Sequence, residues 1–216
     1  MLGLKLPQTA GLPLKVLCLG AHSDDIEIGC GGAILRLAQE IEHLEISWIV
    51  FGANGERERE ARESAALFLG SVKCKKVIVK SFRDSFFPFE GAQIKSYFEE
   101  LKAISPDLIF THNGKDAHQD HRLLAELTWN TFRNHLILEY EIPKYDGDLG
   151  QPNCFVPLAH EVYERKIRYL MQAFGTQRSK QWFGEDTFKA LMRLRGMECV
   201  APSGYAEAFY CRKMVL

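Results

Sequence analysis

The sequence has neither a surplus of one charge nor a long apolar run. Its 27 lysine and arginine residues face 28 acidic ones, which gives a formal net charge of -1 at pH 7. This balance predicts no general attraction to nucleic acid or to an anionic membrane. No stretch approaches the roughly 18 consecutive apolar residues of a membrane span, and Pro7 and Pro13 interrupt the N-terminal stretch, which lacks the apolar core of a secretory signal. We therefore expect a cytoplasmic protein with no membrane span and no nucleic-acid partner.

Cysteine pairs, repeats and linkers are also missing. The six cysteines are scattered without a C-x-x-C pair, so we expect neither a disulfide framework nor a cysteine zinc site. The chain has no internal repeat, no low-complexity tract and no linker long enough to divide it. Its 216 residues are an ordinary length for one α/β domain. We therefore expect a single domain over residues 1–216.

What the sequence does contain is an alternation of β-rich runs and helix-length segments. Clustered apolar and β-branched residues predict strands over 14–20, 45–52, 75–82, 107–112 and 136–143. The segments between them predict helices over roughly 25–43, 56–70, 91–104 and 118–134. This order predicts an α/β fold with a Rossmann-like, mostly parallel sheet flanked by helices on both faces.

The last third of the chain has a different texture. Residues 144–157 are rich in Gly, Pro, Asp and Asn, which is typical of a loop. We expect helices over 159–174 and near 186–196, and a final strand over 206–216 that closes the edge of the sheet.

Two short segments with metal-binding residue types follow strands of this sheet. "AHSDD", residues 21–25, comes directly after the first strand, and "HNGKDAHQDH", residues 112–121, continues from the fourth. In doubly wound sheets, ligands bind beyond the carboxyl ends of the strands, where the strand order reverses. The usual topology makes strands one and four neighbours there. We therefore expect the two segments to face each other across one crevice.

The residue types in the two segments predict a metal site. His22 and Asp25 are three residues apart at a strand-to-helix turn, so both can point at one ion, and His121 would complete the set. Two histidines and one carboxylate with an open fourth position suit catalytic Zn²⁺, although Fe²⁺ or Co²⁺ would accept the same donors. Such a metal would lower the pKa of a bound water and supply hydroxide for attack on a carbonyl.

The other polar residues of these segments predict proton transfer. Asp24 neighbours Asp25 but should point elsewhere, which suits a general base. His118 lies one helical turn before His121 and can share its face. His118 could stabilise an oxyanion or protonate a leaving amine, with Asp120 orienting its ring and raising its pKa.

Three other interpretations compete with an enzymatic metal site. Taken alone, "AHSDD" is compatible with an acidic turn and "HQDH" with the start of a helix. The glycines of "GCGG" also occur in nucleotide-binding loops, but strand two ends without the carboxylate that such sites use. Close helix packing explains these glycines better. A non-catalytic metal- or sugar-binding protein is the third interpretation, which the presence of both Asp24 and His118 disfavours.

The two motifs together closely resemble the PIG-L/LmbE-like family of metal-dependent N-acetylglucosaminyl deacetylases. "AHSDD", with Glu27 after it, and "HQDH" match the family pattern of A-H-P-D-D followed by H-x-D-H. "ARESAALFLG" (61–70) and "YAEAF" (205–209) agree with further family features, so the resemblance covers most of the chain. One departure is Ser23, which stands where the family usually has proline.

The resemblance implies the same roles as the residue types do. It implies His22, Asp25 and His121 as ligands of Zn²⁺ or another divalent metal, Asp24 as the base, and His118, oriented by Asp120, as oxyanion stabiliser or acid. The implied reaction removes the acetyl group from an N-acetylglucosamine-type (2-acetamido) sugar. The alternative is a mycothiol-conjugate-type amidase on the same site.

The substrate contacts are less sharply indicated. The resemblance implies a small-molecule N-acetylated amino sugar or glycoconjugate as the partner. The sequence is also compatible with a homo-oligomer. Arg57 or Arg62, after strand two, could reach sugar hydroxyls or a phosphate, although a solvated helix face with i,i+4 ion pairs is the competing interpretation. Asp84, after strand three, is a candidate for hydroxyl recognition.

Overall fold

The structure is a computed structural model that describes residues 3–4 and 11–215. These residues form one seven-stranded sheet in the order β3-β2-β1-β4-β5-β7-β6. The strands are β1 (Leu14–Gly20), β2 (Leu44–Val50), β3 (Cys74–Val79), β4 (Leu108–His112), β5 (Leu136–Tyr140), β6 (Cys154–Pro157) and β7 (Ala206–Tyr210). The first five strands pair in parallel, whereas β7 is antiparallel to both β5 and β6. The predicted neighbourhood of strands one and four is therefore confirmed.

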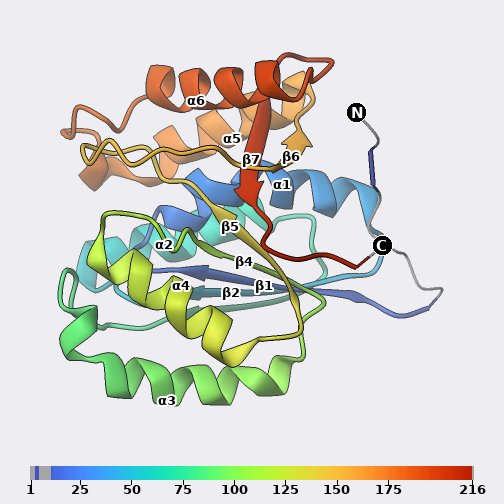
Figure 1. The fold of residues 1–216 in the computed structure, drawn as a ribbon. Coiled ribbons are helices and arrows are strands. Elements are labelled where there is room, and N and C mark those ends of the chain that lie inside the picture. Colours follow the sequence, from blue (N-terminus) through green and yellow to red (C-terminus); the bar gives the residue numbers. More distant parts are fainter. Residues whose placement is uncertain (1–2, 5–10, 216) are drawn as a thin grey trace.

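Helices cover both faces of the sheet, as predicted. They are α1 (Asp25–Glu40), α2 (Gly55–Phe68), α3 (Gly91–Leu101), α4 (Gln119–Thr131), α5 (His160–Ala173) and α6 (Glu185–Glu198). Short 3-10 turns lie at η1 (Phe87–Phe89), η2 (Lys102–Ile104) and η3 (Gly175–Gln177). In Figure 1, α3 and α4 lie on one side of the sheet, and α1, α2, α5 and α6 lie on the other, with α6 outermost.

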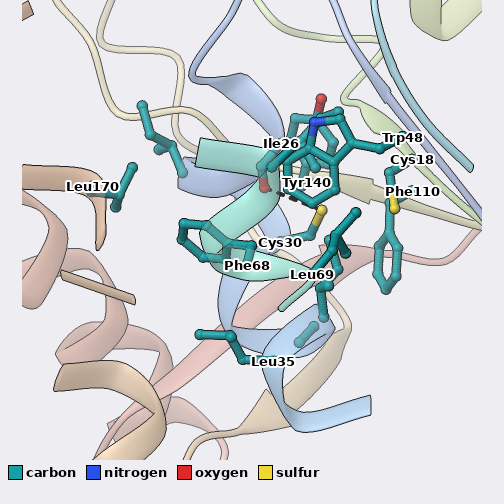
Figure 2. Close-up of a cluster of buried hydrophobic side chains, with 14 of the residues drawn as sticks. Cys18, Ile26, Cys30, Leu35, Trp48, Phe68, Leu69, Phe110, Tyr140 and Leu170 are labelled. Atoms are coloured by element: carbon teal, nitrogen blue, oxygen red, sulfur yellow. Dashed lines mark hydrogen bonds between the residues drawn. The ribbon is translucent and has the colours of Figure 1, made fainter. Parts of the chain in front are cut away.

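Burial on both faces explains why the central strands β1 and β4 are rich in apolar residues. In β1, Val16 and Cys18 enter the core beneath α1 and α2, whereas Leu17 and Leu19 enter the core beneath α3 and α4. Successive side chains of a strand point to opposite faces, so a strand covered on both sides needs apolar residues at every position. Figure 2 shows the first of these cores, where Ile26 and Cys30 of α1 lie among side chains that include Trp48, Phe68 and Tyr140.

Glycines in α1 bring this helix close to the sheet and to α2. A β-carbon on Gly29 would lie 2.2 Å from the ring of Tyr140, and one on Gly31 would lie 2.5 Å from the ring of Phe68. Both rings are drawn in Figure 2. Because glycine has no side chain, α1 can approach these rings where any other residue would clash. The glycine cluster therefore serves close packing, as expected, and lies within a helix rather than in a nucleotide-binding loop.

Two expectations about the last third of the chain are wrong. Residues 154–157, expected within a loop, form strand β6, and β6 rather than the final strand is at the edge of the sheet. Pro157 fits an edge strand because proline cannot donate to a central ladder. The final strand, β7, is buried along most of its length and lies between β5 and β6. It ends at Tyr210, so residues 211–215 do not extend it.

Among the described residues, no helix is both long and apolar enough to cross a bilayer.

Candidate active site

The two motif segments meet at the point where the strand order reverses. β1 ends at Gly20 and leads into the turn that precedes α1, while the parallel neighbour β4 ends at His112 and leads through a short segment into α4. Asp24 occupies the N-cap position of α1, and His118 occupies that of α4. The carboxyl ends of both strands therefore direct polar side chains and two helix N-termini into one region.

Three predicted ligand atoms converge there. His22 Nδ1 lies 3.4 Å from Asp25 Oδ2, His121 Nε2 lies 3.5 Å from the same oxygen, and the two ring nitrogens are 3.2 Å apart. Tetrahedral Zn²⁺ with bonds of 2.0–2.1 Å places its ligands about 3.3 Å from one another. Three electron-rich atoms at this spacing repel one another unless a cation or a proton lies between them. The geometry therefore suits a divalent cation.

Each of the two histidines has a carboxylate at its other ring nitrogen. His22 Nε2 is 3.1 Å from Asp120 Oδ2, and His121 Nδ1 is 2.9 Å from Asp116 Oδ2. A carboxylate at this position holds the proton of the ring on the outer nitrogen and leaves the inner nitrogen free to bind a metal. This pairing orients both rings toward Asp25.

The electrostatics of the two histidines differ. Burial lowers the pKa of His121 to about 4, and the nearby His112 adds to that effect, so the ring of His121 is neutral at neutral pH. Burial acts the same way on His22, but hydrogen bonds to Asp120, Asp25 and Asp84 outweigh it and raise its pKa well above the usual value. A proton and a metal cation therefore compete for His22, as at many metal sites.

A third histidine, His112, lies against this cluster and was given no role from the sequence. It is fully buried, its ring stacks on His121 at 3.9 Å, and its Nε2 lies 3.2 Å from Asp25 Oδ2. His112, Asp25 and His121 thus form an alternative ligand set. However, His112 Nε2 accepts a hydrogen bond from the backbone N–H of Ala21 at 3.0 Å. That bond uses the lone pair a metal would need, so the set with His22 fits better.

Asp24, next to Asp25, is not one of the three converging residues, and its side chain binds Arg57 instead. Arg57 Nη2 donates to Asp24 Oδ1 at 2.9 Å, while Asp24 Oδ2 is buried without a hydrogen-bond partner among the described residues. Burial raises the pKa of Asp24 and the Arg57 guanidinium partly offsets that rise. A buried carboxylate oxygen with no partner is ready to accept a proton from a bound water or substrate.

His118 uses one ring nitrogen as a helix cap. Its Nδ1 accepts a hydrogen bond from the backbone N–H of Asp120 at 3.3 Å. The proton of the neutral ring therefore lies on Nε2, where it can be donated to a ligand. Burial, and next the positive charge of His22, lower the pKa of His118, which favours the neutral form.

Asp120 acts on His118 through its backbone and its charge rather than through a side-chain hydrogen bond: its N–H donates to His118 Nδ1, and its negative charge raises the pKa of His118 without outweighing burial and His22. The Asp120 carboxylate accepts hydrogen bonds from the backbone N–H groups of Ser85 and Phe87, at 2.7 and 3.1 Å, and lies against His22. The carboxylate thus joins the first turn of α4 to the loop that follows β3.

The predicted substrate contacts separate into two groups. Arg57 lies at the site beside Asp24, and Asp84 lies at its opening, with Oδ1 3.2 Å from His22 Nε2 and a side chain that is 72% exposed. Arg62 is not brought to the site: it pairs with Glu58 at 2.8 Å on the exposed side of α2. For Arg62, the structure therefore agrees with a solvated helix face that carries i,i+4 ion pairs.

The segment before α4 is held by residues whose roles the sequence did not reveal. Lys144 Nζ lies 3.0 Å from Asp116 Oδ1 and 2.6 Å from Asp148 Oδ2, and that Asp148 oxygen accepts from the backbone N–H of Ala117 at 2.7 Å. Burial opposes the charge of Lys144, but its bonds to Asp148 and Asp116 outweigh burial and raise its pKa. The only signal in the sequence was Asp116 itself, five residues before His121.

The fold and this cluster define an α/β enzyme with a candidate metal site at the switch point of its sheet. A family model described as "PIG-L: GlcNAc-PI de-N-acetylase" matches residues 17–132. The chain belongs to this family, which confirms the resemblance seen in the sequence, and it is a hydrolase of the deacetylase class. A curated relative, the uncharacterized deacetylase YaiS of Escherichia coli K12, is 31% identical over 167 residues, covering 72% of this chain and 88% of its own.

Solved structures share the fold at low sequence identity. The N,N'-diacetylchitobiose deacetylase from Pyrococcus horikoshii matches 92% of this chain and 83% of its own, with a TM-score of 0.71 and 21% identity. GalB, the 4-carboxy-2-hydroxymuconate hydratase from Pseudomonas putida KT2440, matches 94% of this chain and 97% of its own, with a TM-score of 0.72 and 15% identity. Because a deacetylase and a hydratase share this fold, the reaction must be argued from the site.

Proposed function

We propose that this protein hydrolyses the acetamido group of a 2-acetamido sugar with a divalent metal, Zn²⁺ being the best fit. The observation that carries the proposal is the convergence of His22 Nδ1, Asp25 Oδ2 and His121 Nε2 within 3.2–3.5 Å of one another. The family supplies the deacetylase class, and the diacetylchitobiose deacetylase supports an acetamido sugar as the substrate type.

The donor set is what the proposed metal requires. His22, Asp25 and His121 would hold it, and Asp120 and Asp116 would fix the two histidine rings. A divalent cation in such a site polarises a carbonyl and lowers the pKa of a coordinated water. Two nitrogens and one oxygen suit Zn²⁺, and Fe²⁺ would be accepted by the same donors.

Asp24 and His118 would carry out the proton transfer and the charge stabilisation. Asp24 Oδ2 takes the proton from the attacking water, and Arg57 keeps the other Asp24 oxygen occupied and fixes the carboxylate. His118 Nε2–H donates to the oxygen that becomes negative when the amide carbonyl is attacked. A neutral ring that accepts at Nδ1 is a poor acid, so this geometry favours the oxyanion role of His118. Asp24 then returns its proton to the leaving amine.

The test is acetate release from N-acetylated sugars by purified protein. Activity should disappear with an exhaustive chelator and return with about one equivalent of Zn²⁺ per chain. Activity that survives chelation would contradict the metal-dependent mechanism. Release of an amine from a larger amide, without acetate, would instead favour the alternative, a mycothiol-conjugate-type amidase.

Asp24 and Asp25 provide a matched pair of variants. Asp25→Ala removes a ligand and should lose the metal. Asp24→Asn should keep the metal and reduce kcat by ~10²–10⁴, because a general base typically contributes that much, with little change in KM. Metal content, kcat and KM of both variants decide the assignment. Equal metal loss in the two variants would mean that the roles of Asp24 and Asp25 are wrongly assigned.

A further inference from the structure

The exposed aromatic side chains are concentrated on two loops that contact the candidate site. Among the described residues, the exposed aromatic side chains are Phe86, Phe89 and Tyr145, with 36%, 81% and 69% of their surface accessible. Phe86 and Phe89 follow β3, and Tyr145 follows β5, so both loops leave the carboxyl edge of the sheet. Exposed apolar groups that gather at one place mark binding surfaces more often than scattered ones do.

The first loop, residues 80–90, is held by several hydrogen bonds, so its rings are not exposed for want of local structure. The N–H of Phe86 donates to Arg83 O at 3.0 Å and closes a turn, and the N–H of Arg83 donates to Glu90 Oε1 at 2.9 Å. The Asp120 carboxylate holds the turn through the backbone of Ser85 and Phe87. Ser85 has a φ of +66°, a conformation that costs energy outside glycine and persists only where surrounding contacts enforce it.

The same loop reaches the candidate metal site. Asp84 Oδ1 lies 3.2 Å from His22 Nε2, and the buried ring of Phe87 lies 5.8 Å from the ring of His22. Phe86 lies between Asp84 and Phe87 in the chain. The centroid of its ring is 5.8 Å from that of the Phe89 ring. The exposed ring pair is thus continuous with the site, and it adjoins a carboxylate suited to sugar hydroxyls.

The second loop is fastened to the other part of the site. Lys144 and Asp148, on either side of Tyr145, bind Asp116 and the N–H of Ala117, just before His118. Leu149, which is 46% exposed, follows directly. Both loops are therefore anchored to residues 116–120, and each presents apolar surface beside its anchor.

We propose that Phe86 and Phe89 bind an apolar aglycone, an alkyl or aryl group, attached to the sugar whose acetamido group is cleaved. This inference rests on the proposed function. Asp84 can bind sugar hydroxyls, and two exposed rings lie beside it. This pattern matches a ligand that is polar at one end and apolar at the other.

The experiment compares three substrates at concentrations below micelle formation: N-acetylglucosamine, its octyl β-glycoside and N,N'-diacetylchitobiose. The octyl glycoside should be cleaved with kcat/KM at least tenfold above the free sugar, mainly through KM, because aglycone contacts are made equally in the ground and transition states. In the double variant Phe86→Ser/Phe89→Ser, the ratio of kcat/KM for the octyl glycoside to kcat/KM for the free sugar should fall below about three. Leu194→Ser, at a 52% exposed leucine of α6, is the matched control and should keep the full ratio.

Each other result overturns the inference. An unchanged ratio in the double variant would remove the two rings as the aglycone site. An equal gain with diacetylchitobiose would assign the surface to a second sugar. Binding of wild-type protein to lipid vesicles, lost in the double variant without a change in the ratio, would assign it to a membrane.

Calorimetric binding of the octyl glycoside to Asp24→Asn protein separates this inference from the proposed function, because it needs no turnover. Binding that depends on Phe86 and Phe89 without acetate release from any substrate would leave the aglycone site standing and refute the reaction. Acetate release without such binding would do the reverse.

Discussion

Two lysines, the buried Lys166 and the half-buried Lys144, bind carboxylates in different parts of the molecule. Lys166, in α5, donates to the backbone oxygen of Ile28 and to Glu207, both at 2.6 Å. Glu207, in β7, accepts from the N–H groups of Gly32 and Ala33 at 2.7 and 2.6 Å. In an unbroken helix Gly32 N–H pairs with Ile28 O, so this ion pair supplies partners to both groups in the middle of α1.

Lys144 is used differently. It lies among Asp116, Asp146 and Asp148, and through Asp116 it is connected to His121. The first pair therefore holds α1 against β7 and α5 inside the core, whereas the second holds a segment of the candidate site. The role of each lysine therefore follows from the groups that its carboxylate partner contacts.

Loss of the first pair should cost the most stability. Lys166→Met would leave the Glu207 carboxylate buried with no cation and Ile28 O without its donor, and breaking a buried ion pair from one side typically costs about 3–5 kcal/mol. Urea unfolding measures this loss. Adding Glu207→Gln should restore part of it, since no charge is then left unpaired. A loss under about 1 kcal/mol in the single variant would show that the pair does little for the fold.

Loss of Lys144 should change the affinity for the proposed metal. Removal of a positive charge by itself would favour a cation, so tighter binding is the result expected from charge alone. We expect instead that Lys144→Met weakens Zn²⁺ binding about tenfold, because Asp116 and Asp148 then repel each other and His121 loses its fixed partner. Mutation of such outer partners costs about 10–100-fold in metal affinity. Competition with a chromogenic chelator measures the change.

Two variants make the Lys144 result specific. Lys115→Met carries the same charge change one residue before Asp116, and the exposed Lys115 side chain has no ion-pair partner within the described part of the chain, so its metal affinity should stay near wild type. Asp116→Asn should weaken binding at least as much as Lys144→Met, and combining them should add little. Additive losses would mean that Lys144 does not act through Asp116.

Residue types and spacing were enough to predict which side chains converge at the candidate site. The proposed ligands His22 and Asp25 are close in the chain, and the rule that places ligands where strand order reverses brings His121 to them. The alternation of apolar segments likewise predicted the five parallel strands and the helices on both faces, because the central parallel strands are buried on two sides.

What could not be predicted depends on side-chain direction and on distant partners. Asp120 was assigned to His118 because the two share the start of a helix, yet its carboxylate contacts His22, 98 residues away in the chain. Lys144 came from a segment expected to be a plain loop. Strand β6 has only four residues and includes Pro157, so it shows neither the length nor the alternation that mark a strand.

The smallest expected effect is a pH dependence that should separate the two lysines further. Burial would raise the pKa of Asp116, but His121 first, and then His112 and Lys144, hold it well below its usual range. A carboxyl whose folded pKa is lowered contributes stability above its unfolded pKa, about 3.9, and loses it as pH falls through the folded value. Lys144→Met removes one of the charges that lower the pKa of Asp116. The variant therefore loses less folding free energy than wild type when Asp116 is protonated.

The difference in unfolding free energy between wild type and Lys144→Met should therefore be fully present at pH 6 and shrink by about 1 kcal/mol as pH falls below 4, since one pKa unit corresponds to 1.36 kcal/mol. Urea unfolding at several pH values, with chelator in every sample, measures it. Lys115→Met should show no such trend, because its charge touches no buried carboxylate of the described site. A difference for Lys144→Met that grows toward acid pH would mean that Lys144 does not stabilise the ionised form of Asp116, and the contrast with Lys166 would then lose its electrostatic basis.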